Sequence, residues 1–455
     1  MLRSKEMRIA ITTLGCKINQ YDSAVIQNRL EARHSFVPFD EPADCYIINT
    51  CTVTDRADWE ARQLVRRAKR LSPQAKVLVT GCYAQVNPQD VALVPGVDYV
   101  VGLNRLDDLL NCVATRGNNE AVKIAVSDVK RERAVSVLGT RVLPGHTRAF
   151  VKVQEGCNFT CTYCIIPTAR GLSRSVTARE VLEQVRRLAD SGYMEIVLTG
   201  IHLGSYGHDL RPKIDLTALL EMIVESGLVR RVRLSSLDPR EVSDRLIGLI
   251  AADDRVCPHL HICAQAGDDD ILKQMRRNYD THYYRDLLFK VRERLPEAAL
   301  GSDLIVGFPG ETDARFARSL EFFSALPLTY FHVFPYSTRR GTAAALLPEQ
   351  VPARVKKARA RQMRELGRNK KSAFCHDFIG RRLAVLVEGK RDKKTGYHRG
   401  FSRNYLPVAV RAGHSLVNQE VAVTVDSLDG EWLVGTAADS RTAEGDRPSG
   451  LVVNS

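Results

Sequence analysis

Three cysteines close together in the chain could do the most distinctive chemistry in this sequence. Cys157, Cys161 and Cys164 follow the spacing C-x3-C-x2-C, with Tyr163 directly before the third thiol. Three thiolates on one short loop can hold three corners of a cubane iron–sulfur cluster, because iron favours soft sulfur ligands at tetrahedral corners. The fourth iron is then left without a cysteine, and an open coordination position is where a cofactor or substrate binds. The spacing therefore predicts a catalytic metal centre.

Zinc is the alternative metal for this loop. Cys161 and Cys164 have the C-x2-C spacing of a zinc knuckle. A structural zinc site needs a fourth ligand, usually from a second close pair of Cys or His, and no such pair follows nearby in the sequence. The sequence favours an iron–sulfur cluster over zinc.

The segment around these cysteines resembles the signature of the radical S-adenosylmethionine (SAM) superfamily, in which the unique iron binds the amino and carboxylate groups of SAM. The longer run from Gly156 to Gly171, followed by Ser173-Arg174-Ser175, resembles the narrower methylthiotransferase family. The resemblance implies a 4Fe-4S cluster on Cys157, Cys161 and Cys164, with SAM as cofactor. It also implies an enzyme that forms a 5′-deoxyadenosyl radical and transfers a methylthio group.

Residues 1–128 alternate between predicted strands and helices, which indicates a doubly wound parallel sheet. Cys16, Cys51 and Cys82 each come directly after the carboxyl end of a predicted strand. In an open parallel sheet these ends share one edge, where such folds bind ligands. Cys45 and Cys112 lie inside an apolar strand and helix and are expected to be small buried side chains. The strands are expected at Arg8–Thr13, Cys45–Asn49, Lys76–Thr80 and Asp98–Val101, and the helices at Asp22–Ala32, Ala57–Arg70 and Leu106–Ala114.

The segments around these three strand-end cysteines also resemble the methylthiotransferases. The matching pieces are Thr13–Ser23, Asn49–Thr54 and Gly81–Gln85. In that family the three cysteines hold a second, auxiliary 4Fe-4S cluster with one open iron. The resemblance therefore implies two clusters, with Cys16, Cys51 and Cys82 as the ligands of the second, whose open iron carries the sulfur that is methylated and transferred.

After an expected linker at 129–148, residues 149–345 show six strand–helix units, which predict a partial (β/α)6 barrel. The radical SAM resemblance implies the same fold. Chemistry in such barrels takes place at the carboxyl ends of the strands. The strands are expected at Phe150–Gln154, Ile196–Thr199, Val232–Ser235, His259–Cys263, Asp303–Val306 and Tyr330–Phe334, and the helices at Ala178–Asp190, Leu216–Ser226, Arg240–Ala251, Tyr283–Arg294 and Asp313–Ala325.

Four residues at these strand ends are candidate SAM contacts. Tyr163 and Phe308 could pack on the adenine, although either could instead be ordinary packing at the barrel mouth. Gly200 could permit close backbone approach because it lacks a side chain, and Gln265 is a candidate polar contact. Where relatives usually have Gln-Ser-Gly-Ser, this chain has Gln265-Ala-Gly-Asp268, so two hydroxyl groups that could hold SAM are missing.

The C-terminal part is basic and predicts contact with a polyanion. The 455-residue chain has a formal net charge of +13, and its densest basic run lies within 346–373, expected as a helical linker. That helix could be only a solvated surface, but the β-rich region 374–438 beside it contains further lysines and arginines and favours nucleic acid. This region predicts a small β-barrel resembling the RNA-binding TRAM domain. Residues 439–455 are expected to be disordered.

Members of the methylthiotransferase family act on different substrates. The runs around Cys16 and Cys51 look most like the tRNA enzymes acting at C2 of N6-threonylcarbamoyladenosine at position 37, in the anticodon loop. Enzymes for isopentenyladenosine in tRNA, or for an aspartate of a ribosomal protein, remain alternatives. A non-catalytic, metal-stabilised RNA-binding protein is the alternative of another class. Since the threonyl carboxylate calls for a cation, the nearby arginines are candidates, although they could be ordinary surface residues: Arg170, Arg174, Arg339 and Arg340.

The expected surroundings of the enzyme follow from this chemistry. A radical SAM methylthiotransferase needs an electron donor such as a flavodoxin or ferredoxin, and a sulfur donor. No secretory signal is recognisable and no apolar run approaches the roughly 20 residues of a membrane helix. We therefore expect a cytoplasmic enzyme that does not contact a membrane.

Overall fold

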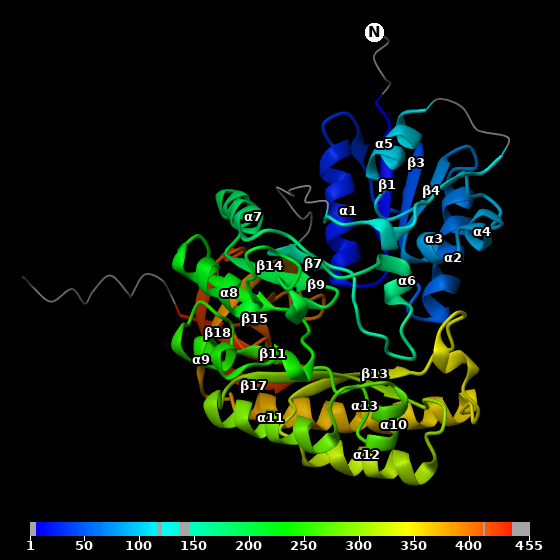
Figure 1. Cartoon of the computed structure of the whole chain (residues 1–455). Coiled ribbons are helices and arrows are strands. Elements are labelled where there is room, and N and C mark those ends of the chain that lie inside the picture. Colours follow the sequence, from blue (N-terminus) through cyan, green and yellow to red (C-terminus); the bar gives the residue numbers. More distant parts are fainter. Residues whose placement is uncertain (1–5, 116–120, 136–145, 413–414, 439–455) are drawn as a thin grey trace, which may run out of the picture. The chain divides into compact units, whose positions relative to one another are not determined.

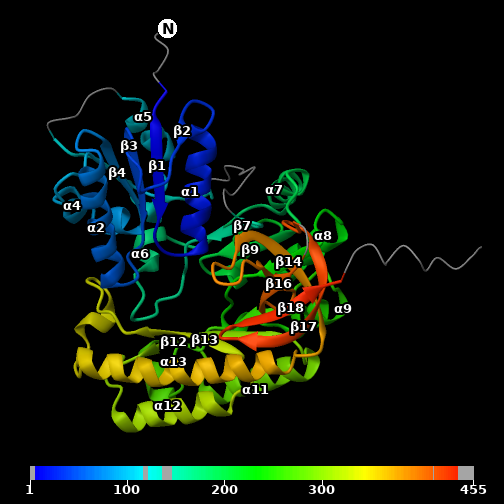
Figure 2. The same cartoon turned by 180° about the vertical axis from the view of Figure 1, so that it is seen from behind.

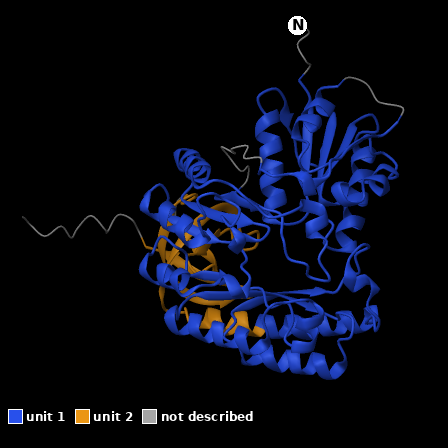
Figure 3. Ribbon diagram, in the orientation of Figure 1, with its two compact units in different colours: residues 1–368 blue, residues 369–455 orange. Residues whose placement is uncertain are grey.

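The structure is a computed structural model and describes residues 6–115, 121–135, 146–412 and 415–438 (Figures 1 and 2). The chain divides into two compact units, residues 1–368 and 369–455 (Figure 3). The expected disordered tail and the middle of the expected linker at 129–148 lie outside the described residues. No helix in the described ranges combines the length and apolar character needed to span a membrane.

Unit 1 begins with a parallel six-stranded sheet in the order β2-β1-β3-β4-β5-β6. Its order changes direction at β1 and β3, the point where doubly wound folds bind ligands. The prediction of a doubly wound sheet is confirmed. The strands are β1 (Arg8–Thr13), β2 (Ser35–Phe36), β3 (Cys45–Thr50), β4 (Lys76–Gly81), β5 (Tyr99–Val101) and β6 (Lys123–Ala125); the helices are α1 (Lys17–Leu30), α2 (Asp55–Leu71), α3 (Cys82–Val86), α4 (Pro88–Ala92), α5 (Leu106–Ala114) and the 3₁₀ turn η1 (Val129–Arg131).

Helices cover both faces of this sheet, which explains why β3 and β4 are buried along their whole length. Tyr46 and Ile48 point to the face covered by α2, whereas Ile47 points to the face covered by α1 and α5. The short elements β2, β6, α3 and α4 were not predicted, because two to five residues are too few to show a period. Helix α1 begins at Lys17, five residues before the predicted start, because its first turn carries polar residues and lacks an apolar repeat.

The second part of unit 1 contains six parallel strands that are joined in two sheets. One sheet has the order β10-β9-β7-β8, in which the short edge strand β8 is antiparallel, and the other has the order β11-β12-β13. Only isolated bridges, such as Leu237 with Ile262, join β10 to the next segment. The predicted partial barrel is confirmed, with a weak seam that the sequence did not indicate. The strands are β7 (Arg148–Glu155), β8 (Arg174–Ser175), β9 (Glu195–Gly200), β10 (Arg231–Leu234), β11 (His259–His261), β12 (Ala299–Val306) and β13 (Tyr330–Pro335).

The helices of this part agree with the predicted ranges except around 240 and 270. Arg240 lies in a 3₁₀ turn that Pro239 begins, and the α-helix starts only after its cap, Ser243. Asp268 caps an unpredicted short helix through its contact with the Ile271 N–H. The helices are α6 (Ile166–Arg170), α7 (Ala178–Asp190), η2 (Leu203–Ser205), α8 (Leu216–Glu225), η3 (Pro239–Glu241), α9 (Asp244–Ala252), α10 (Asp269–Gln274), α11 (Thr281–Arg294), α12 (Asp313–Ala325) and η4 (Ala343–Leu346).

The basic run forms helix α13 (Ala353–His376), which contains the boundary between the two units. Ala360 and Met363 are buried in the barrel core of unit 1, and Arg359 pairs with Glu311 over 2.7 Å. Cations therefore do not surround this helix on all sides, since one face packs in the core of unit 1.

Unit 2 contains a closed five-stranded barrel in the order β14-β15-β16-β18-β17. The predicted small β-barrel is confirmed, although β15 was not recognised because its sequence is short and polar. The strands are β14 (Arg382–Arg391), β15 (His398–Ser402), β16 (Pro407–Arg411), β17 (Glu420–Asp429) and β18 (Trp432–Ala437).

One carboxylate and two arginines form a buried ion triad inside the larger barrel. Glu195 lies 2.7 Å from both Arg231 and Arg233, and all three are buried. Burial opposes ionisation, but the two arginines lower the pKa of Glu195 to about 2. Because this folded-state pKa is lower than the ordinary pKa of about 4.5, the stabilisation is complete above that ordinary value and is lost as the pH falls toward 2.

We expect Glu195→Gln to lower the free energy of unfolding at pH 7 by about 3–5 kcal/mol, because two buried cations lose their partner. The variant should also show a weaker dependence of stability on pH between about 5 and 2. Urea unfolding of the two proteins at several pH values measures both effects. A loss at pH 7 that is the same at pH 3 would contradict the assignment.

Candidate active site

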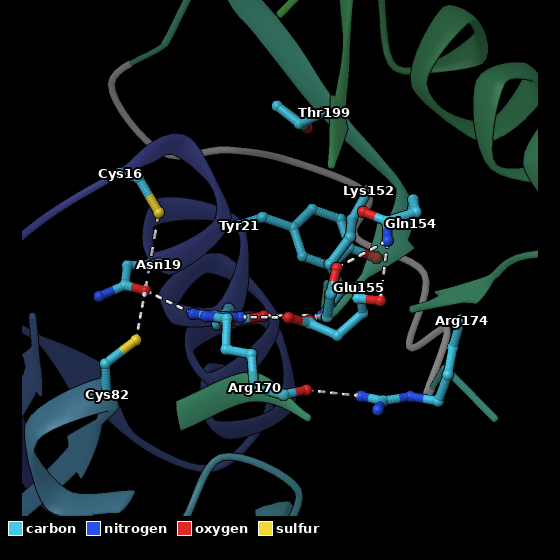
Figure 4. A network of polar contacts seen from close by, with 12 residues as sticks. Cys16, Asn19, Tyr21, Cys82, Lys152, Gln154, Glu155, Arg170, Arg174 and Thr199 are labelled. Carbon is cyan, nitrogen blue, oxygen red and sulfur yellow. Dashed lines mark hydrogen bonds and ion pairs between the residues drawn. The ribbon is translucent and has the colours of Figure 1, made fainter. Parts of the chain in front are cut away.

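The three strand-end cysteines of the first sheet lie around a single asparagine. The thiols of Cys16 and Cys82 each donate to Asn19 Oδ1 over 3.9 Å. The Asn19 amide donates to the carbonyl oxygens of Leu14 and Thr50, over 2.8 and 3.0 Å. These carbonyls belong to the turns before Cys16 and Cys51. One buried side chain thus connects all three loops, as Figure 4 shows for Cys16 and Cys82.

Glycines before two of these cysteines allow the loops to approach. Gly15 and Gly81 both have positive φ angles, 103° and 93°. A Cβ on Gly15 would lie 2.8 Å from Cys51 Cβ, and one on Gly81 would lie 2.3 Å from the Thr50 carbonyl oxygen. The recurring Gly-Cys pairs are therefore explained by the close spacing of the three loops.

The second set of cysteines lies at the carboxyl end of β7, on the loop before α6. Cys157 Sγ lies 3.7 Å from His202 Nδ1, and Arg277 donates to Cys161 Sγ over 3.1 Å. Burial raises the pKa of the Cys164 thiol to about 12, and the neighbouring charges of Cys161 and Cys157 act in the same direction. The three thiols therefore belong to one electrostatically coupled group.

A cation accompanies each set of thiols. Burial by itself would lower the pKa of His202, but hydrogen bonds to Cys157 and Glu241 raise that pKa to about 10. The His202 imidazole is therefore charged at neutral pH. Arg277 lies beside Cys161, and Arg170 lies beside Cys82, whose thiol burial raises to a pKa of about 12. A metal ligand must be a thiolate, and these cations offset the negative charge that three thiolates bring together.

Both groups offer thiol donors to a metal. Iron–sulfur clusters are held by cysteine thiolates, so these soft donors fit a cubane cluster.

A buried arginine that follows the second set of cysteines in the chain reaches the asparagine beside the first set. Arg170 ends α6, just after the second set, and donates to Asn19 Oδ1 over 2.5 Å (Figure 4). It also pairs with Glu155 over 2.7 Å and with Asp22 over 3.1 Å. Lys152 pairs with the same two carboxylates, over 3.0 and 2.9 Å. Two buried cations and two carboxylates thus join the barrel to the first sheet.

Known protein families match two segments of unit 1. Residues 8–102 match an uncharacterised protein family, UPF0004, and residues 151–323 match the radical SAM superfamily. The chain is 37% identical over 420 residues to the threonylcarbamoyladenosine tRNA methylthiotransferase MtaB of Bacillus subtilis, covering 92% of this chain and 93% of the relative. The Aquifex aeolicus protein of the same name is 38% identical, with 92% and 100% coverage.

This chain belongs to the radical SAM methylthiotransferase family. A tRNA-2-methylthio-N6-dimethylallyladenosine synthase of Pelotomaculum thermopropionicum is also similar, at 33% identity over 97% of this chain and 100% of the relative. Among solved structures, the radical SAM methyltransferase TsrM of Kitasatospora setae has a TM-score of 0.52 at 18% identity and covers 72% of each chain. That likeness concerns the fold alone.

A cavity of about 240 Å³ in this methylthiotransferase is lined by residues from segments that carry the cysteines of both groups. Val53 and Thr54, just after Cys51, form one wall, and Cys164 forms part of the other. The remaining lining is contributed by Tyr163, Ile165, Ile166, Gln265, Asp303, Ile305, Phe334, Pro335, Tyr336 and Ser337. The segment after Cys51 and the loop of Cys164 therefore line one chamber.

The four candidate SAM contacts differ in their surroundings. Tyr163 and Gln265 line the cavity, and Gln265 adopts a left-handed backbone with φ 65°. Phe308 is fully buried and contacts the Tyr336 ring edge-on, which matches the packing alternative. A Cβ on Gly200 would lie 3.0 Å from Gln154 Oε1, so the side chain that approaches this glycine is Gln154.

The departure at Asp268 has a structural explanation. Its carboxylate caps α10 and pairs with Arg318 over 2.6 Å. The residue is buried and is occupied by these contacts. Asp268 therefore contributes to folding of the loop in this chain.

Three of the four arginines suggested for a substrate carboxylate are engaged elsewhere. Arg170 is buried in the ion pairs described above, and Arg174 donates to the Leu172 and Arg170 carbonyls. Arg339 donates to Asp55 over 2.6 Å and also contacts Asp58. Arg340 is exposed. These contacts occupy the first three side chains, and sequence position at a barrel mouth does not show which acids lie opposite.

Sequence reasoning missed Asn19, His202 and Arg277. His202 lies in the loop after β9, at the expected barrel mouth. A histidine in such a loop was the sequence signal that could have identified it. Asn19 and Arg277 reach the cysteines from a helix and from a distant loop, and no spacing rule connects them to the thiols.

The central arginine gives a prediction about stability. Arg170→Met should lower the free energy of unfolding of the cluster-free protein by about 3–5 kcal/mol, because it leaves buried carboxylates without a full set of partners. Arg187→Met is the matched control, since Arg187 forms an exposed pair with Glu183, and it should cost less than about 1 kcal/mol. Equal losses in urea unfolding would refute the central role of Arg170.

Proposed function

We propose that this chain is a tRNA-modifying enzyme that methylthiolates C2 of N6-threonylcarbamoyladenosine at position 37, giving 2-methylthio-N6-threonylcarbamoyladenosine. The observation that carries the reaction is the presence of two three-cysteine groups, with Cys164 of one and the segment after Cys51 of the other lining one chamber. The substrate follows from the names of the relatives that are 37% and 38% identical over 92% of this chain.

Each group of thiols fits one 4Fe-4S cluster. Cys157, Cys161 and Cys164 would hold the cluster that binds SAM, and Cys16, Cys51 and Cys82 would hold the auxiliary cluster. When bound, these clusters and SAM supply the radical that removes hydrogen from an aromatic carbon and the sulfur that replaces it.

The chain contributes position, charge and exclusion of water. Asn19 and Arg170 hold the auxiliary cysteine loops in place relative to the barrel. Ile165, Ile305 and Tyr336 give the cavity an apolar wall, which keeps water from a reactive intermediate. We propose that Tyr163 and Gln265, which line this cavity, contact SAM.

Unit 2 has features that suit RNA. Lys390, Arg391, Lys393 and Lys394 are exposed on and beside β14. The Phe401 ring stacks on Tyr405 at 5.0 Å, and Arg399 lies 4.7 Å from the Trp432 ring. Cations combined with aromatic surfaces are typical of proteins that bind single-stranded nucleic acid. We propose that this barrel binds the tRNA, as in a TRAM domain.

A dimethylallyl-bearing adenosine is the second candidate substrate. A relative named for it is 33% identical and spans 97% of this chain. An electron donor such as a flavodoxin or ferredoxin, a sulfur donor and a cytoplasmic location also belong to this proposal, because the reaction requires the first two and tRNA is found in the third.

Mass spectrometry of tRNA nucleosides tests the substrate directly. Cells lacking this protein should lose 2-methylthio-N6-threonylcarbamoyladenosine and accumulate its unmethylthiolated precursor. Expression of the intact gene should restore the product, whereas a gene encoding Cys157→Ala should not. Loss of the dimethylallyl product instead, or no change in tRNA, would reject the proposed substrate.

Iron analysis tests the two sites separately. The anaerobically reconstituted protein should contain about eight iron atoms for two clusters. Replacing Cys157, Cys161 and Cys164 by alanine should remove about half of the iron and all reductive SAM cleavage. Replacing Cys16, Cys51 and Cys82 should also remove about half, but SAM cleavage should persist. Cys45→Ala is the control, because this buried thiol lies outside both groups, and it should keep the full iron content.

A further inference from the structure

Polar side chains line one face of the sheet β11-β12-β13, beside the cavity. Phe331 and Val333 of β13 point to the opposite face and are buried in the core of the barrel. His332 lies between them in sequence, points the other way and is exposed. Asp303 of β12 is its register partner and lines the cavity together with Cys164. This polar face therefore opens toward the place where the chemistry is proposed.

The side chains on this face form a compact group. His261, Asp303 and His332 each have a nitrogen or oxygen atom within 4.8 Å of one another. His261 Nε2 lies 3.1 Å from Asp303 Oδ1, and its Nδ1 lies 3.2 Å from the Tyr330 hydroxyl. The imidazoles of His261 and His332 stack at 5.6 Å with an angle of 22°.

Neighbouring residues hold this group in place. The Tyr330 hydroxyl also lies 2.8 Å from His259 Nε2. Gly301, the register partner of both His261 and Tyr330, leaves room for them, because a Cβ there would lie 2.3 Å from the tyrosine ring. His261 is buried, whereas His332 is exposed, so the group presents its polar atoms from a fixed base.

The charges of this group suit a polar ligand. Burial of Asp303 would raise the pKa of its carboxyl, but the His261 and His332 imidazoles hold that pKa below its usual range. The carboxylate is therefore ionised at neutral pH and accepts hydrogen bonds, while the imidazoles can donate them. Arg170, Arg174 and Arg339 are occupied by other partners, so they do not compete for this role.

We propose that His261, Asp303 and His332 receive the polar N6 substituent of the target adenosine and select threonylcarbamoyl over dimethylallyl. This inference rests on the proposed function. The His332 imidazole donates to the carboxylate or hydroxyl of the threonyl group, and Asp303, which His261 positions, accepts from its hydroxyl or a ureido N–H. A dimethylallyl group offers this polar face neither a donor nor an acceptor, which is how hydrogen-bonding sites reject apolar analogues.

Binding of anticodon stem–loop RNAs to the reconstituted holoenzyme tests this selection. Three RNAs differ only at position 37, which carries threonylcarbamoyladenosine, dimethylallyladenosine or plain adenosine. We expect the native protein to prefer the first RNA. His332→Phe should weaken that binding about tenfold, the effect of losing one good hydrogen bond to a charged group, and should leave binding of the plain RNA unchanged. His332→Gln, which keeps a donor, should retain most of the preference.

His282→Phe is the matched control. His282 is exposed on α11 and pairs only locally with Asp286, so the same substitution there should change none of the three affinities. Iron content, measured for every variant, shows whether the clusters are retained. Equilibrium dialysis with SAM shows whether the group serves the cofactor.

Three results would overturn the inference. They are an unchanged preference in His332→Phe, a loss of SAM affinity in that variant, and one zinc or manganese ion per chain that disappears with His332. A native holoenzyme that modifies only the dimethylallyl RNA would reject the proposed function, and this inference with it. If the native protein modifies the threonylcarbamoyl RNA while His332→Phe keeps the preference, only the selection by this group fails.

Discussion

The buried guanidinium of Arg170 is the contact on which the arrangement of unit 1 depends. Arg170 is only 2% exposed, so water cannot replace its protein partners. It pairs with Asp22 of α1, beside the first sheet, and with Glu155 of β7, in the barrel. A cation at that depth is stable only with its acids in place. The first sheet and the barrel are therefore held at a defined relation, and with them the loops that carry the cysteines.

The same physical requirement explains the cations beside the thiols. Three thiolates in a partly buried loop repel one another, and nearby positive charge reduces that cost. His202 and Arg277 serve the loop after β7, and Arg170 serves the sheet-end cysteines. None of these side chains is a metal ligand in the proposed sites. Their positions put positive charge beside the thiols of both groups.

Arginine at the mouth of this barrel has mainly an internal role. Arg339 joins the loop after β13 to Asp55 and Asp58 at the start of α2, just as Arg170 joins α6 to α1. Both links connect elements more than 140 residues apart in the chain. The polar face that remains beside the cavity is formed by histidine and aspartate. These groups are smaller than a guanidinium, and His261 and Asp303 pair with each other over 3.1 Å.

The sequence by itself determined the elements and the ligands. Periodicity identified the long strands and helices, because each buries one apolar face, and the position directly after a strand end identified the cysteines of the first sheet. Short elements such as β2, β6 and α10 were missed because they carry too few residues to show a period. Only the tertiary structure decided that Asn19 joins three loops, that Arg170 and Arg339 are buried, and that His261, Asp303 and His332 meet. Such contacts depend on which strands become neighbours, and strand order is set by packing of the whole chain.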